Sequence, residues 1–307
     1  MSTPFVIESF EEYLSTVRKE LPKARIYFRG QNKIVNAGYL LKPSIGRYQK
    51  LESISLFQRD QVEREVLGVF TNHLLTYVRH LPRNDWEALA IAQQHGLPTR
   101  FMDWTTNPLV ALYFAVRETK LDDNDVPLDS AVYVLTSEPL RFSDLGRPSE
   151  DSITPVPDSA TTPVSIPSAY SDFGVDDTTM SETDTGSKIS SATSAMGAVL
   201  APEQKEVVKE EEGSLITPFE ISENVIYHPP HVSPRIRAQD AVLLACHQPM
   251  LSLEEKDYLE IVIKHEAHDD IRRRLDQYGV FDKQLFPDLD GIAKWLKYRV
   301  FEIDGQC

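Results

Sequence analysis

The sequence of 307 residues predicts an α+β domain, in which a mixed, mainly antiparallel small sheet packs against several helices. Two observations predict this class. Short apolar segments with strand character are mixed with amphipathic helical segments, and these segments do not alternate regularly as in a doubly wound fold. Hydrophobic residues make up 41% of the chain, which is enough for a sizeable core.

Helices are expected where apolar residues recur at helical spacing beside capping signals. The first begins after Ser9, which has capping-box spacing to Glu12. A helix over 85–95 ends at Gly96, and Asn107 followed by Pro108 begins an almost wholly apolar helix over 109–118. The other predicted helices span 61–80, 268–278 and 287–300. Residues 61–80 carry an apolar stripe of Val62, Val66, Val69, Phe70, Leu74, Tyr77 and Val78.

Strands are expected where short runs of β-branched, aromatic and other apolar residues stand between turn signals. The predicted strands are 25–29, 131–135, 225–228, 241–247 and 258–264. Residues 103–107 are expected to form a polar turn ahead of a helix.

Residues 147–217 are rich in Ser, Thr, Pro, Asp and Glu, with few large apolar side chains. They hold 13 acidic and 4 basic residues, so this stretch carries −9 of the chain's net charge of −15. We expect a disordered acidic insertion, because such a composition cannot offset the entropy of ordering. Residues 1–146 and 218–307 are expected to form one domain together. The Ser/Thr-Pro-rich insertion is a candidate for contact with a protein partner.

The composition also excludes several classes of protein. The net charge of −15 argues against general nucleic-acid binding and against docking on anionic lipid. Two cysteines, Cys246 and Cys307, cannot build a disulfide framework or a cysteine-rich zinc site, which indicates a reducing cytoplasmic or nuclear compartment. The N-terminus does not resemble a signal peptide, and no apolar run is long enough to span a membrane. We expect no metal, since His228 and His231, the close histidine pair that we would test as metal ligands, lack further local ligands.

Four polar clusters are candidates for a site: residues 28–31, 93–100, 103–107 and 235–240. Arg29 ends an apolar strand, which favours an arginine that points into a cleft and holds a phosphate or carboxylate group. Residues 103–107 precede a helix, whose N-terminus favours anions. These clusters predict a phosphate-bearing ligand, such as a small nucleotide.

The strings YFRGQ, AIAQQHGLPTRFMDWTTNPLVALYFAV, SPRIRAQDAVLLA and YGVFDKQLFPDLDGIAKWL occur in that order and resemble the FRG domain over roughly residues 20–300. The resemblance implies an intracellular domain. Its motif falls on Phe28, Arg29, Gly30, His95, Gly96, Thr99, Arg100, Asp103, Thr105, Pro108, Arg235 and Gln239. The family often has glycine where this chain has Ala241.

A second resemblance is to ADP-ribosyltransferases, through the order of Arg29, then Thr105 and Thr106 ahead of an apolar helix, then Gln239. It implies an arginine on the NAD diphosphate or ribose, a threonine hydroxyl on the nicotinamide ribose, and a later acid that stabilises positive charge. Gln239 carries no charge, so either Asp103 or Asp240 takes that role, or the site binds without that chemistry.

The candidate catalytic residues are therefore Arg29, Asp103, Thr105 and Gln239. The candidate ligand-binding residues are Arg29, Gly30, His95, Arg100, Thr106 and Arg235. Three functions stay open: an enzyme that uses NAD as a substrate, for ADP-ribosyl transfer or NAD hydrolysis; a non-catalytic binding module with a regulatory or defence role; and a nucleic-acid-processing enzyme with Asp103 as base or metal ligand.

Overall fold

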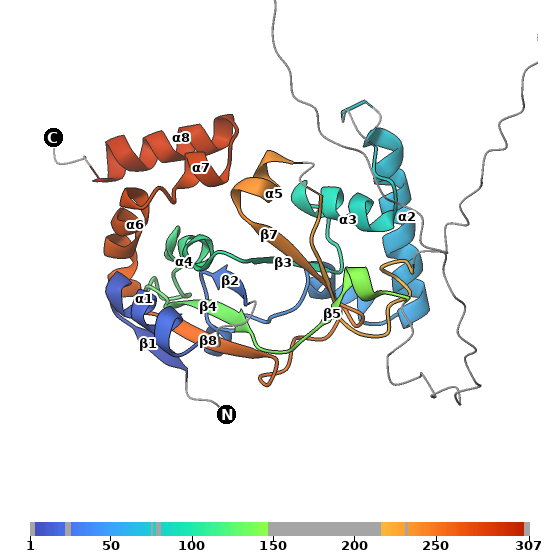
Figure 1. The fold of residues 1–307 in the computed structure, drawn as a ribbon, viewed down its shortest axis with the longest axis horizontal. Helices are drawn as coiled ribbons and strands as arrows, with labels where there is room; N and C mark the ends of the chain where they lie inside the picture. Colours follow the sequence, from blue (N-terminus) through green and yellow to red (C-terminus); the bar gives the residue numbers. More distant parts are fainter. Residues whose placement is uncertain are drawn as a thin grey trace, which may run out of the picture. The chain divides into compact units, whose positions relative to one another are not determined.

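An eight-stranded mixed sheet organises the part of the chain that the computed structural model describes, residues 4–21, 26–74, 76–77, 81–146, 216–230 and 233–303. The strand order is β1-β8-β4-β2-β3-β7-β6-β5 (Figure 1). The outer pairs β1–β8 and β5–β6 are parallel and the inner pairs are antiparallel. The α+β class and the mainly antiparallel sheet are thus confirmed.

The strands are β1 (Phe5–Ile7), β2 (Tyr27–Gln31), β3 (Phe101–Thr105), β4 (Ser130–Leu135), β5 (Leu140–Arg141), β6 (Val225–Tyr227), β7 (Ala241–Ala245) and β8 (Tyr258–Ile263). The helices are α1 (Phe10–Lys19), α2 (Leu56–Leu74), α3 (Asp85–Gln94), α4 (Pro108–Val116), α5 (Pro234–Ala238), α6 (His268–Gln277), α7 (Asp282–Leu285) and α8 (Leu289–Lys297). A π-helical turn, Tyr298–Ile303, follows α8. Among the described residues, no helix has both the length and the apolar character needed to cross a membrane.

The two faces of the sheet are covered differently. Alternate residues of a strand point to opposite faces, so Val132 and Val134 on β4 join the core formed with α1, α4 and α6. Ala131 and Tyr133 join the core on the other face, where a loop segment that includes Leu41 covers the sheet. A further core lies where α2 and α3 pack against β3, β6 and β7, with Trp86 at its centre.

Local capping signals begin or end three of the helices, α1, α3 and α4, as predicted. The Ser9 hydroxyl accepts from the amide of Glu12 at 3.2 Å, and the Asn107 side chain accepts from the amides of Leu109 and Val110. Gly96 follows α3 with φ of +85°, a left-handed conformation that glycine adopts without strain.

Two expectations were wrong. Most of the polar turn expected over 103–107 is instead part of strand β3, a central strand. Its residues are buried except for Asp103, which is exposed. Helix α2 begins at Leu56 rather than Gln61, and the valines of its apolar stripe do not face the core, although Leu74 is buried and Phe70 packs against the core. Val66 and Val69 are exposed, whereas Glu63 is buried, because Glu63 pairs with a buried arginine.

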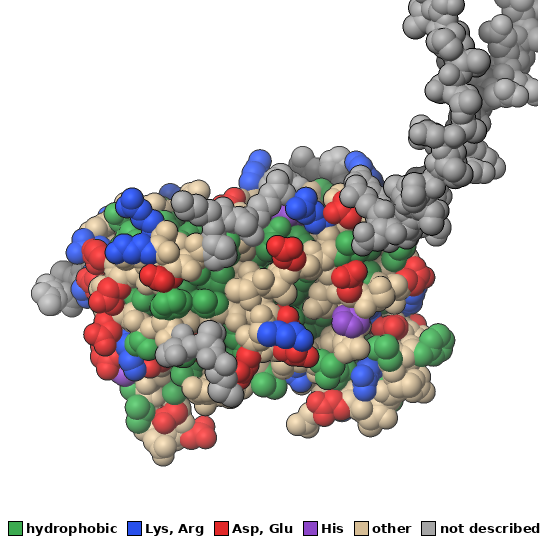
Figure 2. Space-filling view, turned by 60° about the horizontal axis from the view of Figure 1, so that its bottom comes forward, with side chains coloured by type: hydrophobic (Ala, Val, Ile, Leu, Met, Phe, Trp, Pro, Cys, Tyr) green, Lys and Arg blue, Asp and Glu red, His purple; other side chains and the backbone are tan. Residues whose placement is uncertain are grey.

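Residues 1–147 and 214–307 form one unit by their contacts. The predicted acidic insertion, 147–217, lies outside the described residues except for its last two positions. Figure 2 shows acidic, basic and apolar side chains interspersed over one face of the molecule, without a large patch of one charge sign.

His268, at the start of α6, is a buried histidine held by two hydroxyl groups. Thr119 Oγ1 lies 2.8 Å from its Nδ1 and Ser130 Oγ lies 2.8 Å from its Nε2. Burial lowers the pKa of this imidazole below its usual value. The folded protein therefore holds His268 neutral at pH values where the unfolded chain protonates it.

The free energy of unfolding should fall as the pH drops from 7 to 5. The unfolded chain takes up a proton at His268 near its ordinary pKa of about 6.5, and the folded state does not. This contribution is complete above that pKa and is lost below it, at no more than about 1.4 kcal/mol per pH unit. Urea denaturation across this range measures the slope. His268→Gln should reduce the slope, and an unchanged slope in this variant contradicts the assignment.

Candidate functional site

A pocket opens where the sheet divides between β2 and β3. These strands pair at one position, Phe28 with Thr105, whereas β2 pairs with β4 over five positions and β3 pairs with β7 over five. Beyond that single pair the two strands separate, and the pocket, about 320 Å³, lies between them.

Residues of β2, β3, β7, α3, the end of α4 and the α5 region line the pocket, together with Phe286. Its polar lining residues are Arg29, Gln31, Gln93, Gln94, Asp103, Thr105, Arg117, Arg235 and Gln239. Three arginines and a single aspartate give the lining a local positive balance, although the chain as a whole is acidic. Phe28, Phe114 and Phe286 add aromatic surface.

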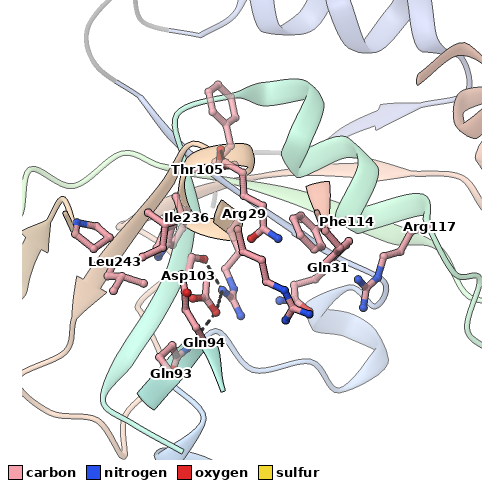
Figure 3. A pocket seen from close by; sticks show the side chains of 18 residues that line it. Arg29, Gln31, Gln93, Gln94, Asp103, Thr105, Phe114, Arg117, Ile236 and Leu243 are labelled. Carbon is pink, nitrogen blue, oxygen red and sulfur yellow. Dashed lines mark hydrogen bonds and ion pairs between the residues drawn. The ribbon is translucent and has the colours of Figure 1, made fainter. Parts of the chain in front are cut away.

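Arg29 bridges the division of the sheet. Its Nη1 donates to the backbone carbonyl of Asp103, a group on the opposite side of the division (Figure 3). Its Nε lies 3.3 Å from the Tyr39 hydroxyl, to which it donates. With its amide oxygen turned toward Arg29, Gln31 also accepts from Nε at 3.1 Å and from Nη2 at 2.8 Å. The guanidinium is thus partly buried, and most of its donors bind protein acceptors.

Asp103 is the carboxylate in the pocket lining. Its side chain is 60% exposed and lies 4.0 Å from the Arg29 guanidinium. Gln93, on α3, donates to Asp103 Oδ2 at 3.0 Å, and the Gln93 amide oxygen accepts from the Thr99 hydroxyl at 2.6 Å. The Gln93 amide thus orients the Asp103 carboxylate, and the exposed edge of that carboxylate faces the pocket.

Thr105 and Gln239 also reach the pocket, but their polar groups are engaged in the fold. The Thr105 hydroxyl donates to the backbone carbonyl of Gln239 at 2.7 Å and accepts from the amide of Asn107 at 3.0 Å. The Gln239 side-chain amide donates to the carbonyl of Leu285 at 3.0 Å. These bonds join β3 to α5, and α5 to α7, so both residues hold the walls of the pocket in place.

Arg235, on α5, lines the pocket and forms an ion pair outside it. Its Nε donates to Asp288 Oδ2 at 3.0 Å, and its Nη2 binds the same oxygen. Asp288 also caps α8 through the amide of Gly291 at 2.9 Å. The Gly291 amide, and after it the Arg235 guanidinium, hold the pKa of Asp288 below its usual value.

Gly30 lines the pocket, and its lack of a side chain serves the packing of α4. A Cβ atom at Gly30 would lie 1.8 Å from the carbonyl oxygen of Ala111 and 2.8 Å from the amide nitrogen of Ala115. Only glycine allows α4 to approach β2 this closely.

Arg100 was expected to bind the ligand, and the structure corrects this. Its side chain is buried outside the pocket, where it pairs with Glu63 at 2.9 Å and with Asp60. Burial raises the pKa of the Glu63 carboxyl group, and the contacts with Arg100 oppose this rise. An arginine between two acids inside the fold is structural, because its charge is already matched.

His95, Thr106 and Asp240 are also placed away from the pocket lining. His95 ends α3 as an exposed residue beside Phe70. Thr106 is exposed, and its amide donates to the carbonyl of Asp240. Asp240 lines a separate hollow, so Asp103 is the better placed of the two carboxylates. His231 of the histidine pair lies outside the described residues.

The sequence motifs do not indicate Arg117, Phe114 and Phe286 as pocket residues. Arg117 follows α4 and lies over the rings of Phe114 and Phe286, 5.3 and 5.8 Å from their centroids. The signal for Arg117 was present, because a lone cation follows a nine-residue helix that has no charged residue. Nothing local to Phe286 indicates that a loop before α8 reaches the pocket.

Comparison with known proteins identifies one family within the chain. Residues 24–124 match the model of the FRG domain, so an FRG domain is present in the chain. The matched stretch runs from β2 to beyond α4 and thus contains both strands at the division of the sheet. No curated protein and no solved structure matches the chain.

Proposed function

We propose that this FRG-domain protein binds a phosphate-bearing nucleotide in the pocket between β2 and β3, with NAD as the first candidate. The observation that carries the proposal is the lining of the pocket, where three arginines and three phenylalanine rings surround one exposed carboxylate. Guanidinium groups recognise phosphate oxygens, and aromatic rings provide flat surface against which a base packs. The volume, about 320 Å³, lies within the range of small-ligand sites.

The chemistry that fits this lining is cleavage of the nicotinamide–ribose bond. In NAD hydrolysis the bond from ribose C1′ to the nicotinamide nitrogen breaks, nicotinamide leaves with the bonding pair, and water adds to C1′ and releases a proton. In ADP-ribosyl transfer an acceptor nucleophile replaces the water. Positive charge develops at the ribose, and Asp103 is the carboxylate available to stabilise it. Asp103 then supplies the charge that Gln239 lacks.

Binding without turnover is the second candidate, and a specific observation favours it. The Thr105 hydroxyl and the Gln239 amide, both expected to act on the ligand, are engaged in hydrogen bonds within the fold. A pocket whose polar groups are committed in this way recognises a nucleotide without assisting bond cleavage.

Asp103→Asn separates the two candidates. In an enzyme, this variant should lose turnover of labelled NAD by on the order of 100-fold while its affinity for NAD changes little, because the carboxylate acts on charge that develops only in the transition state. Calorimetry measures the affinity, and chromatography of labelled nicotinamide measures turnover. Asp123→Asn removes an exposed carboxylate elsewhere and should retain full activity.

Two outcomes of the same assays on the wild-type protein would decide against one or both candidates. If the wild-type protein binds NAD and neither cleaves it nor modifies proteins of a cell extract, the binding module is supported and the enzyme is rejected. If it binds none of NAD, ADP-ribose and ATP, the proposed function is wrong.

A further inference from the structure

We infer that Arg117 is the residue that receives the phosphate groups of the ligand, so that the ligand lies with its phosphates at the α4 side of the pocket and its sugar beside Asp103. This inference rests on the proposed function and adds an orientation and an anchoring residue to it. Figure 3 shows the two sides: Arg117 and Phe114 on one, Asp103 with Gln93 and Gln94 on the other, and Arg29 between them.

The first step compares the donors of the three lining arginines. Arg29 uses its donors on the carbonyl of Asp103 and on Tyr39 and Gln31. Arg235 uses two of its donors on Asp288. A ligand phosphate would have to displace these bonds or share them. Both arginines are therefore better suited to shape the pocket than to receive a phosphate first.

Arg117 differs from both. Its guanidinium makes no hydrogen bond and no ion pair with any residue that the structure describes. It also borders a second hollow, lined by Glu118, Asp269 and Glu302, but no described carboxylate lies within 4.0 Å of it. Five N–H donors are thus available, and an arginine with unmatched charge at a pocket gains most from binding an anion.

Two rings hold this guanidinium in place. Side chains on a helix lean toward its N-terminus, which carries Arg117 back over Phe114, three residues earlier. Phe286 meets Phe114 edge to face, with the centroids 5.9 Å apart, and adds a second surface under the guanidinium. Cation–π contacts therefore orient the guanidinium without using its N–H groups, which keeps the donors free for a ligand.

Further positive charge gathers at the same place. Around the Phe286 ring, Arg235 lies 5.5 Å and Lys294 lies 6.0 Å from the centroid, in addition to Arg117. Among the described residues, Asp288 is the carboxylate paired with this group of cations. A ligand phosphate at this place would therefore be attracted by several cations at once.

The opposite side of the pocket is suited to hydroxyl groups. Gln93, Gln94 and Asp103 offer amide and carboxylate groups, which donate to and accept from the hydroxyls of a ribose. No arginine other than Arg29 lines that side. The cations other than Arg29 thus gather at the α4 side, whereas Asp103 and two amides lie at the opposite side, so a nucleotide with distinct phosphate and sugar parts is expected to bind in one orientation.

The test measures affinity by calorimetry for four probes: ADP-ribose, ADP, adenosine and inorganic pyrophosphate. Arg117→Ala should weaken ADP-ribose, ADP and pyrophosphate by about tenfold or more, because a charge-assisted contact is lost, and should leave adenosine within about twofold. The salt dependence of ADP-ribose affinity should also become shallower. Arg117→Lys should recover part of the loss, since it keeps the charge but not the bidentate geometry.

Controls separate binding from folding. Arg273→Ala removes an exposed arginine of α6 outside the pocket lining and should bind all four probes as the wild type does. Should Arg117→Ala fold poorly, Arg117→Gln keeps most of the side-chain stem and tests the same loss of charge. The melting temperature of each variant reports its folding.

Two results overturn the inference: an Arg117 variant that binds ADP-ribose and pyrophosphate like the wild type, or one that loses adenosine as strongly as ADP-ribose. Failure of the proposed function looks different. In that case the wild-type protein binds no nucleotide, and only the pyrophosphate titration still reports on Arg117. Wild-type pyrophosphate binding that Arg117→Ala weakens then supports the phosphate role of Arg117, and absence of binding rejects it.

Discussion

Arg100→Ala should lower the free energy of unfolding by about 3–5 kcal/mol, the usual cost of removing one partner from a buried ion pair. Arg100 is 1% exposed and binds Glu63, Asp60 and the carbonyl of Pro218. The substitution leaves the Glu63 carboxylate buried without its cation and removes the bond to the carbonyl of Pro218. Urea denaturation measures the loss.

The double variant Arg100→Met with Glu63→Leu is the informative comparison. It removes both buried charges and should be more stable than Arg100→Ala, because the carboxylate that remains beside the replaced arginine, that of Asp60, is partly exposed to solvent. Arg273→Ala, at an exposed site, should change stability by less than about 0.5 kcal/mol. A loss below about 1 kcal/mol in Arg100→Ala would show that Glu63 does not depend on its arginine.

Gly30→Ala should cost about 3 kcal/mol or more, at the upper end of overpacking effects. The added Cβ meets the backbone of α4 at 1.8 Å, and backbone cannot rotate away as a flexible side chain can. Either α4 shifts away from β2 or the strand bends. Both changes would alter the shape of the pocket, because β2 and the end of α4 line it. Thermal denaturation and the yield of soluble protein report the effect.

Gly68→Ala is the matched control for this substitution. Gly68 lies on the exposed side of α2, and a Cβ atom added there would meet no neighbouring atom within 4 Å. Alanine there should stabilise the protein by about 0.5–1 kcal/mol, since glycine is a poor residue inside a helix. The same chemical change should therefore have opposite signs at the two sites, and a similar effect at both would contradict the packing argument at Gly30.

Local signals in the sequence predicted the ends of several elements, and non-local contacts caused the errors. Ser9, Asn107 and Gly96 act within a few residues of themselves, so their roles can be read directly. Helix α2 is different. Its valine stripe predicts a buried face, but Glu63 is buried instead because it meets Arg100, 37 residues later in the chain.

The candidate site was predicted in part for the same reason. Arg29, Asp103 and Arg235 line the pocket, and the sequence motifs indicated each of them. Arg100 stands in a polar cluster, residues 93–100, that is typical of a ligand-binding segment. Its acidic partners come from α2, and only the tertiary fold shows them. Phe286 reaches the pocket from a loop well beyond Arg235 in the chain, and no local pattern reveals such a contact.

The single backbone pairing between β2 and β3 has a consequence for how this domain can diversify. Elsewhere in the sheet, continuous ladders fix the spacing of neighbouring strands. At this one join, the spacing depends on side chains, chiefly the reach of Arg29 to the carbonyl of Asp103. Substitutions there can widen or narrow the pocket while both halves of the sheet keep their register. One scaffold can in this way accommodate ligands of different size without being refolded.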